Sequence, residues 1–171
     1  MRALVVVGVL ALLALTFVIT ALLRDSQRGS ASGDACPAGF KRANVVLRET
    51  KDIKINVLNA TDTAGLAASV ATDFKNRKFQ IVKQGNDKKR VDSVAVLRFG
   101  PKGVGSAHLL KAYFLNEAED EYDPNRDDDT VDVVIGNSYT QLATTTEVNQ
   151  ALSAAGAPTP PPGSCADKSG A

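Results

Sequence analysis

The chain has 171 residues with two cysteines, one histidine and no tryptophan, which leaves room for one modest domain plus appended segments. Its net charge of +1 conceals an uneven distribution, because residues 41–102 carry 14 Lys and Arg against 6 Asp and Glu, whereas residues 103–140 carry 2 against 9. The folded part should therefore be dipolar. An acidic half would repel phosphates, which argues against a nucleic-acid-binding protein.

An uncharged stretch lies at the start of the chain, where Ala3–Leu23 runs for 21 residues without Asp, Glu, Lys or Arg. At about 1.5 Å per helical residue, it matches a hydrocarbon core about 30 Å thick. Residues 1–23 are therefore predicted to form a transmembrane anchor, which makes this a single-pass protein of the cell membrane. The alternative is a cleaved signal peptide, whose apolar region is about 7–15 residues and for which Ser30–Gly33 is the candidate cleavage site. One arginine precedes the span and two follow it closely, so positive charge leaves its orientation open.

Residues 24–43 begin as a small, polar, Gly/Ser-rich segment, which is typical of a flexible stalk. Cys36 and Cys165 flank the globular region, and neither belongs to a Cys-x-x-Cys motif. We expect a disulfide between them; the alternative is two unpaired thiols in flexible segments. Because such bonds persist outside the cytoplasm, a bridge would make the C-terminal domain extracytoplasmic.

The strongest secondary-structure pattern is a strand, a tight turn and a helix between Ile53 and Phe74. Alternating apolar residues at 53, 55 and 57 predict a strand with one buried face. The helix follows from Leu66, Val70 and Phe74, which recur every four residues. We expect Asp62 or Thr63 to cap this helix and Gly65 to allow its first turn to lie close to the strand.

Further elements complete an α+β domain over residues 44–142. In chain order they are a short strand at Asn44–Leu47, strands at Phe79–Val82 and Ser93–Phe99 around a polar hairpin, a helix at Val104–Leu115 capped by Ser106, and a strand at Val131–Ile135. The core order βαββαβ predicts a ferredoxin-like sandwich, with two helices on one face of an antiparallel sheet. Residues 143–171 form a C-terminal extension, with a short helix through Leu152 and an extended Pro-rich tail from Pro158.

Several of these segments resemble the C-terminal domain of the LytR family of cell-envelope proteins. The family's opening strand, turn and helix start correspond to Val57-Leu58-Asn59-Ala60-Thr61 and Gly65-Leu66-Ala67. The resemblance continues through Phe79–Val82, Val96–Pro101 and Val131–Gly136, and covers roughly residues 51–142. Ala60 departs from it, since the family usually has Gly there. The motif residues with a structural role are Asn59, Thr61, Gly65, Leu66 and Gly136, and they indicate a fold rather than a reaction.

Three features could carry chemistry, and each has a simpler structural explanation. Gly100–Ser106 opens a helix without the Lys-Ser/Thr of a Walker motif, which favours a connecting loop; the alternative is an anion contact by Lys102 and the amides of Gly105 and Ser106. His108 is the single histidine and has no evident catalytic or metal-binding partners. Residues 123–129 resemble a calcium loop but lack its central Gly and its closing Glu, which favours a solvated acidic loop. We therefore expect no catalytic residue, metal or cofactor, and no enzyme activity.

Basic residues on predicted strand ends and loops are the candidate contacts for a glycan or another anionic ligand. They are Lys83, Lys88, Lys89, Arg90 and Lys102. An exposed hairpin tip is the alternative explanation for the run at 88–90.

The resemblance implies a role at the cell wall. LytR-type C-terminal domains often follow a phosphotransferase domain that attaches wall polymers to peptidoglycan; this chain lacks that domain and is similar to the stand-alone VirR-like envelope proteins. It implies a non-catalytic anchored protein that binds peptidoglycan or wall-attaching transferases of the LytR-CpsA-Psr type. Such a protein would tether membrane to wall and support envelope integrity and control of vesicle release. The alternatives are a protein–protein adaptor that does not bind glycan and a small hydrolase, for which residues are missing.

Overall fold

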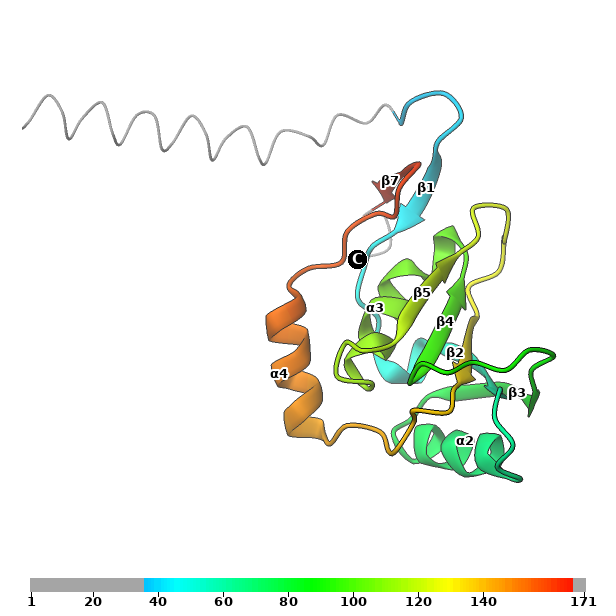
Figure 1. Ribbon diagram of the computed structural model, residues 1–171. Coiled ribbons are helices and arrows are strands. Elements are labelled where there is room, and N and C mark those ends of the chain that lie inside the picture. Colours follow the sequence, from blue (N-terminus) through cyan, green and yellow to red (C-terminus); the bar gives the residue numbers. More distant parts are fainter. Residues whose placement is uncertain (1–35, 168–171) are drawn as a thin grey trace, which may run out of the picture. The chain divides into compact units, whose positions relative to one another are not determined.

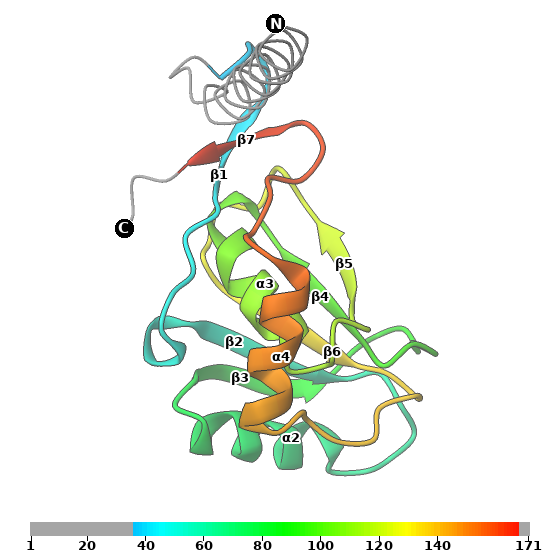
Figure 2. The same ribbon diagram turned by 90° about the vertical axis from the view of Figure 1, so that its left-hand side faces the viewer.

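The computed structural model describes residues 36–167, of which residues 38–167 belong to one compact unit (Figures 1 and 2). Its strands are β1 (Lys41–Asn44), β2 (Lys54–Asn59), β3 (Gln80–Asn86), β4 (Ala95–Phe99), β5 (Glu119–Tyr122), β6 (Val131–Ile135) and β7 (Ser164–Asp167). Its α-helices are α2 (Leu66–Asn76), α3 (Val104–Ala112) and α4 (Thr145–Ala155), with 3-10 turns η1 (Thr50–Asp52) and η2 (Pro101–Gly103). The predicted span Ala3–Leu23 lies outside the described residues, and within 36–167 no helix has the length and apolarity needed to cross a membrane.

The main sheet is mixed, with strand order β3-β2-β6-β4-β5. Strand β2 is parallel to both β3 and β6, whereas β4 is antiparallel to β6 and parallel to β5. The α+β class is thus confirmed, but the ferredoxin-like antiparallel sheet is wrong. Each β-α-β unit, β2-α2-β3 and β4-α3-β5, returns to a position directly beside its first strand, and β6 joins the two units.

The core lies between the sheet and an aromatic cluster contributed by both helical connections. Phe74 of α2 is fully buried and meets the rings of Phe79 at 5.1 Å and of Tyr113 at 5.8 Å, both edge-on. Phe79 and Tyr113 also contact each other, with ring centroids 5.2 Å apart. These rings join α2 to the end of α3 over one face of the sheet. The helix positions 66, 70 and 74 read from the sequence are indeed the inward-facing stripe.

A row of polar side chains crosses the sheet, one from each strand. Lys83, Asn56, Asp132, Arg98 and Glu121 are register partners from β3 through β2, β6 and β4 to β5. Asn56, Arg98 and Asp132 alternate with buried residues of β2, β4 and β6, so these three project from the face opposite the core. Hydrogen bonds connect neighbours in the row, from Asn56 Nδ2 to Asp132 Oδ1 at 2.6 Å and from Arg98 Nε to Glu121 Oε2 at 2.7 Å.

The turn after β2 is closed by its own side chains. Asn59 Oδ1 accepts from the amide of Thr61 at 3.0 Å and from its hydroxyl at 2.8 Å, while Asn59 Nδ2 donates to the Thr63 carbonyl at 2.8 Å. The predicted cap at Asp62 or Thr63 is wrong, because α2 begins after Gly65, which makes no side-chain cap. Gly65 adopts φ +78° and a Cβ there would meet nothing within 4 Å, so it serves backbone conformation rather than close packing.

Two other glycines, at Gly105 and Gly136, serve close packing instead. A Cβ at Gly136 would lie 2.0 Å from the Ser93 carbonyl oxygen, and one at Gly105 would lie 2.0 Å from that of Val46. Helix α3 begins at Val104, and Ser106 is 2% exposed inside it, so the expected Ser106 cap is wrong. The N-cap position is Gly103, which has no side chain to act as a cap.

The predicted strand boundaries shift at two places. The short strand expected at residues 44–47 forms at Lys41–Asn44, because its partner is β7 rather than the main sheet. Strand β3 runs to Asn86, so residues 84–86 of the expected hairpin continue the pairing with β2.

The C-terminal segment packs back on the domain. Helix α4 starts in a capping box, in which the Thr144 amide donates to Glu147 Oε2 at 2.7 Å and the Glu147 amide donates to Thr144 Oγ1 at 3.4 Å. It lies along α3 (Figure 2), and beyond the end of that helix Asn116 Nδ2 donates to the Ala151 carbonyl at 2.9 Å. The chain then reaches β7, which pairs in parallel with β1.

Cys36 and Cys165 are the two cysteines of the chain, and both are disulfide-bonded. The predicted bridge is therefore confirmed. Cys165 lies in β7 opposite Arg42 of β1, so the covalent link reinforces the pairing of these two strands.

Candidate functional site

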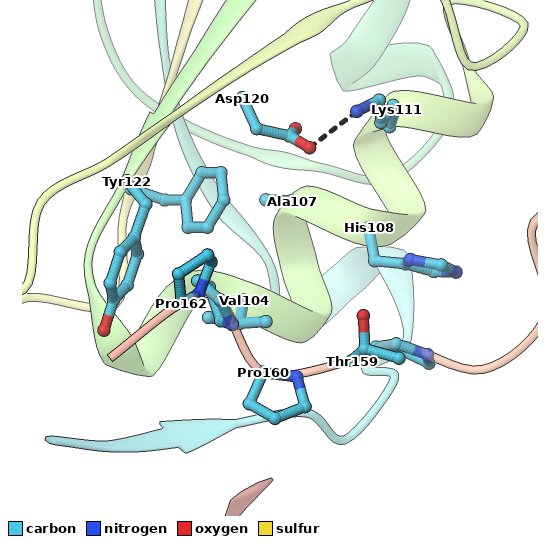
Figure 3. A pocket seen from close by; sticks show the side chains of 12 residues that line it. Val104, Ala107, His108, Lys111, Asp120, Tyr122, Thr159, Pro160 and Pro162 are labelled. Carbon is cyan, nitrogen blue, oxygen red and sulfur yellow. Dashed lines mark hydrogen bonds and ion pairs between the residues drawn. The ribbon is translucent and has the colours of Figure 1, made fainter. Parts of the chain in front are cut away.

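The C-terminal segment closes a cavity over α3. We call Pro158–Pro162 the strap and the space beneath it the strap cavity, which has a volume of about 350 Å³ (Figure 3). Its lining comes from β4, α3, β5 and the strap: Phe99, Val104, Ala107, His108, Lys111, Asp120, Tyr122 and Pro158–Pro162. This volume is at the lower end of the range for small-ligand sites.

Helical spacing explains which α3 residues line the cavity. Positions 104, 107, 108 and 111 recur at intervals of three and four, so they share one face of the helix. The register of β5 against β4 places Asp120 opposite Leu97 and Tyr122 opposite Phe99, on the core side of the sheet. The floor of the cavity is therefore fixed by one helix and two strands.

One part of the lining is apolar and aromatic. The rings of Phe99 and Tyr122 have their centroids 5.9 Å apart, and Val104 and Ala107 are buried beside them. Among residues 36–167 the buried hydroxyl of Tyr122 has no hydrogen-bond partner. Figure 3 shows Tyr122 along one side of the cavity and the strap prolines at the end away from Asp120.

The other part is polar and has no net charge. Lys111 Nζ donates to Asp120 Oδ2 at 2.5 Å, and both side chains remain partly exposed, at 28% and 44%. His108 Nε2 lies 3.0 Å from the Gly156 carbonyl oxygen, where α4 gives way to the strap. The cavity thus combines a hydrogen-bond donor, Lys111, and an acceptor, Asp120, which contact each other. The aromatic rings of Phe99 and Tyr122 face this pair.

The polar side chains of the cavity are held by partners within the protein. The one histidine contacts a backbone carbonyl instead of a nucleophile, and Lys111 is held in an ion pair. Within the described part of the chain, no three His, Cys, Asp or Glu residues gather as a metal site would require. A nucleophile, an activating base and an orienting group in hydrogen-bond reach of one another are missing from this cavity.

The structure separates the basic residues that the sequence analysis grouped. Lys88, Lys89 and Arg90 form an exposed loop after β3, where the Lys89 amide donates to Asp87 Oδ1 at 2.9 Å and Arg90 pairs with Asp62. Lys102 lies in η2 after β4, which runs antiparallel to β6 and so ends at the opposite end of the sheet. Lys102 therefore lies at the opposite end of the sheet from Lys88, Lys89 and Arg90.

Lys83 lies in a second hollow, which the sequence analysis did not find. We call it the β3 groove; its volume is about 390 Å³, and its lining is Ala71, Thr72, Lys75, Ile81, Val82, Lys83 and Gln84. A bulge leaves Val82 without a partner on β2, and its side chain is 60% exposed. The spacing of Ala71, Thr72 and Lys75 could have shown that these residues share one face of α2. The bulge that brings Val82 beside them could not be predicted from the sequence.

Two alternatives from the sequence are not supported by the geometry. The Val46 carbonyl packs against Gly105 and Ser106 is buried, so this start of α3 has no open surface for an anion. In the acidic loop, Asp128 is paired with Arg126 and Asp129 with Lys54 and Arg48, so these carboxylates are committed to cations of the protein.

The part of the chain that matches a known family is the main sheet with its two helical connections. Residues 52–139, about half of the chain, match the family described as LytR cell envelope-related transcriptional attenuator. The chain belongs to this family. Strands β1 and β7, helix α4 and the strap lie outside the matched region, so the strap cavity joins a family-derived floor to a cover contributed by the C-terminal segment.

Two similar proteins come from mycobacteria. The chain is 29% identical over 113 residues to the cell envelope integrity protein Cei of Mycobacterium tuberculosis, a match that covers 64% of this chain and 51% of that protein. It is also similar to the crystal structure of the soluble domain of a conserved hypothetical secreted protein from Mycobacterium marinum. That match has a TM-score of 0.55 and 31% identity and covers 61% of this chain and 72% of the other. The chain thus spans about half the length of Cei.

Proposed function

We propose that this protein is a non-catalytic binding module of the cell envelope that connects the membrane to the wall. Its N-terminal segment would anchor it in the membrane, and its folded unit would bind peptidoglycan or the LytR-CpsA-Psr transferases that attach polymers to it. Membership of the LytR family and similarity to an envelope integrity protein both support a cell-envelope role.

The disulfide is the observation that carries the proposal. Bonds of this kind persist in oxidising compartments and are rare in the cytosol. Cys36 lies 13 residues after Leu23, so a folded unit closed at Cys36 and Cys165 would stand outside the cytoplasm, near the membrane surface. A short flexible linker of that length reaches roughly 20 Å, which suits contact with material close to the membrane.

The adaptor function is the second candidate, and the β3 groove favours it. Strand β3 is at the edge of the sheet, Val82 is exposed, and Lys75 and Lys83 flank the hollow. Exposed apolar groups beside cations suit a protein partner that carries a hydrophobic side chain and carboxylates.

Binding to washed peptidoglycan sacculi tests the first candidate. If the basic loop contributes, simultaneous replacement of Lys88, Lys89 and Arg90 by Glu should lower binding, and the affinity of the parent protein should fall steeply with salt, because exposed charges are screened within about 8 Å at physiological ionic strength. The matched control reverses Lys41, Lys51 and Lys78, three exposed lysines elsewhere. Equal binding by both triple variants would remove the basic loop as a wall contact.

A complementation experiment tests the tether. A deletion strain should show higher envelope permeability and shed more membrane vesicles, and the full chain should restore both. The domain from Ser32 onward, secreted without its anchor, should fail to do so. Full rescue by the unanchored domain would favour the adaptor over the tether.

A further inference from the structure

We propose that the strap cavity is a saccharide site that holds one residue of an uncharged envelope glycan chain; N-acetylhexosamines, the sugars of the peptidoglycan in the proposed function, are the class tested. The inference deepens the proposed function by assigning a position and a ligand class to wall binding. In this inference the specific contact with the glycan is made by a partly enclosed site and not by the exposed basic residues.

The aromatic and proline surfaces provide the first argument. A pyranose ring has a face of C–H groups, which packs on flat apolar surfaces as other apolar groups do. The strap cavity has such surfaces on more than one side, in the rings of Phe99 and Tyr122 and in the prolines of the strap. A volume of about 350 Å³ suits one sugar residue with its substituent.

The polar end provides the second argument. The Lys111–Asp120 pair offers a charged donor and a charged acceptor 2.5 Å apart, and both are partly exposed. Adjacent sugar hydroxyls both donate and accept, so they match such a pair. Hydrogen bonds in which one group is charged are stronger than those between neutral groups.

Charge separates this ligand class from wall phosphates. An anionic polymer would meet the carboxylate of Asp120 as closely as the ammonium of Lys111, so the pair gives it no net attraction. A neutral sugar uses both groups. Ligand affinity should therefore depend weakly on salt if the strap cavity is the site, and strongly if the exposed run at Lys88–Arg90 is the site.

The strap explains why the site is formed in advance. Four of its five residues are prolines, whose φ is fixed, so little backbone freedom remains to be lost when a ligand binds. Its ends are held by the His108 contact at Gly156 and by the disulfide-linked pairing of β7 with β1.

The test uses the full chain in lipid nanodiscs and chitotriose as the probe, followed by saturation-transfer difference NMR. We expect transfer to one sugar residue of the trimer, little change in affinity between 50 and 300 mM salt, and no competition by inorganic phosphate. Asp120→Asn and Lys111→Gln should each lower the affinity about tenfold or more, because each removes one charged hydrogen bond. Glu117→Gln, an exposed carboxylate outside the lining, is the matched control and should bind as the parent does.

The outcomes distinguish this inference from the function on which it rests. Sacculus binding that persists without any transfer to chitotriose would overturn the saccharide site and leave the envelope-binding function in place. Loss of chitotriose binding in the Lys88–Lys89–Arg90 reversal, with binding intact in Asp120→Asn, would move the site to the basic loop. If the parent protein binds neither sacculi nor chitotriose, the saccharide site and direct wall binding both fail, and only binding to a protein partner is left of the proposed function. Unchanged thermal unfolding of the Asp120 and Lys111 variants would confirm that they are folded.

Discussion

Arg126 donates two hydrogen bonds to the carboxylate of Asp132, from Nη1 to Oδ2 at 2.8 Å and from Nη2 to Oδ1 at 3.2 Å. The same guanidinium reaches the Arg98 carbonyl at 3.2 Å and Asp128 on its other side. Asp132 is the central member of the polar row across the sheet. One arginine thus fixes the loop after β5 over the open face of the domain.

We predict that Arg126→Met destabilises the domain by about 2 kcal/mol, because it leaves the largely buried carboxylate of Asp132 without its charged partner. Lys51→Met is the control, since Lys51 pairs with Glu49 in full solvent and exposed pairs contribute little. Urea unfolding measures both. A midpoint for Arg126→Met equal to that of the control would show that loop 123–130 is held by other contacts.

Acid should weaken the domain through Asp87 and Asp128. Burial by itself would raise the pKa of Asp87, but the Lys89 amide and the Arg98 guanidinium outweigh it and lower that pKa. The hydrogen bond from Arg126 lowers the pKa of Asp128. Because both pKa values are lower folded than unfolded, the stabilisation is complete above the ordinary Asp pKa of about 4 and is lost as pH falls through the folded values.

The free energy of unfolding, measured from pH 7 down to pH 2, should therefore be flat at first and then decline below about pH 4. Asp87→Asn should make that decline shallower. A decline of the same steepness in this variant would assign the acid sensitivity to other carboxylates.

Gly136→Ala should destabilise the domain by about 3 kcal/mol, the upper end for overpacking, because its Cβ would lie 2.0 Å from the Ser93 carbonyl and force β6 and the segment before β4 apart. Gly85→Ala is the matched control, since a Cβ there meets nothing within 4 Å. Thermal unfolding compares the two. Equal melting temperatures would mean that the backbone at Ser93 moves without cost.

The disulfide should protect the terminal strands more than the core. Alkylation without reductant should leave Cys36 and Cys165 unmodified, and reduction should expose both. Removing the bridge in a Cys36→Ser, Cys165→Ser variant should cost about 2–4 kcal/mol, since it closes a long loop. Hydrogen exchange should rise at β1 and β7 while β2 and β6 stay protected; uniform exchange across all four would show that the bridge stabilises the core as well.

Local patterns in the sequence predicted the core elements well. Alternation identified β2 and β6, and the four-residue recurrence ending at Phe74 identified α2 and its buried face, because both signals depend on burial of one side. The sheet order could not be obtained in this way. It depends on β5, whose sequence Glu-Asp-Glu-Tyr has no apolar alternation and is recognisable only by its pairing with β4.

The candidate site was less accessible to sequence reasoning. His108 was noticed as the single histidine but was not predicted to be a site residue. Asp120, Tyr122 and the strap prolines come together only because the C-terminal segment folds back over α3. The two cysteines were the one signal of that return, since a bridge from Cys36 to Cys165 brings the chain after the prolines to the start of the domain. The exposed lysines were easier to notice, yet the fold distributes them over both ends of the sheet.

The pairing of β1 with β7 also gives the domain two routes for mechanical load. A pull that enters on the N-terminal side at Cys36 divides between the backbone leading into β1 and the covalent link to Cys165. The second route continues through β7 into the strap, which is drawn along its own length before the load reaches α4. Tension would thus tighten the cover of the cavity. In a protein that tethers two layers, as proposed above, such tightening would hold the ligand more firmly as the layers separate.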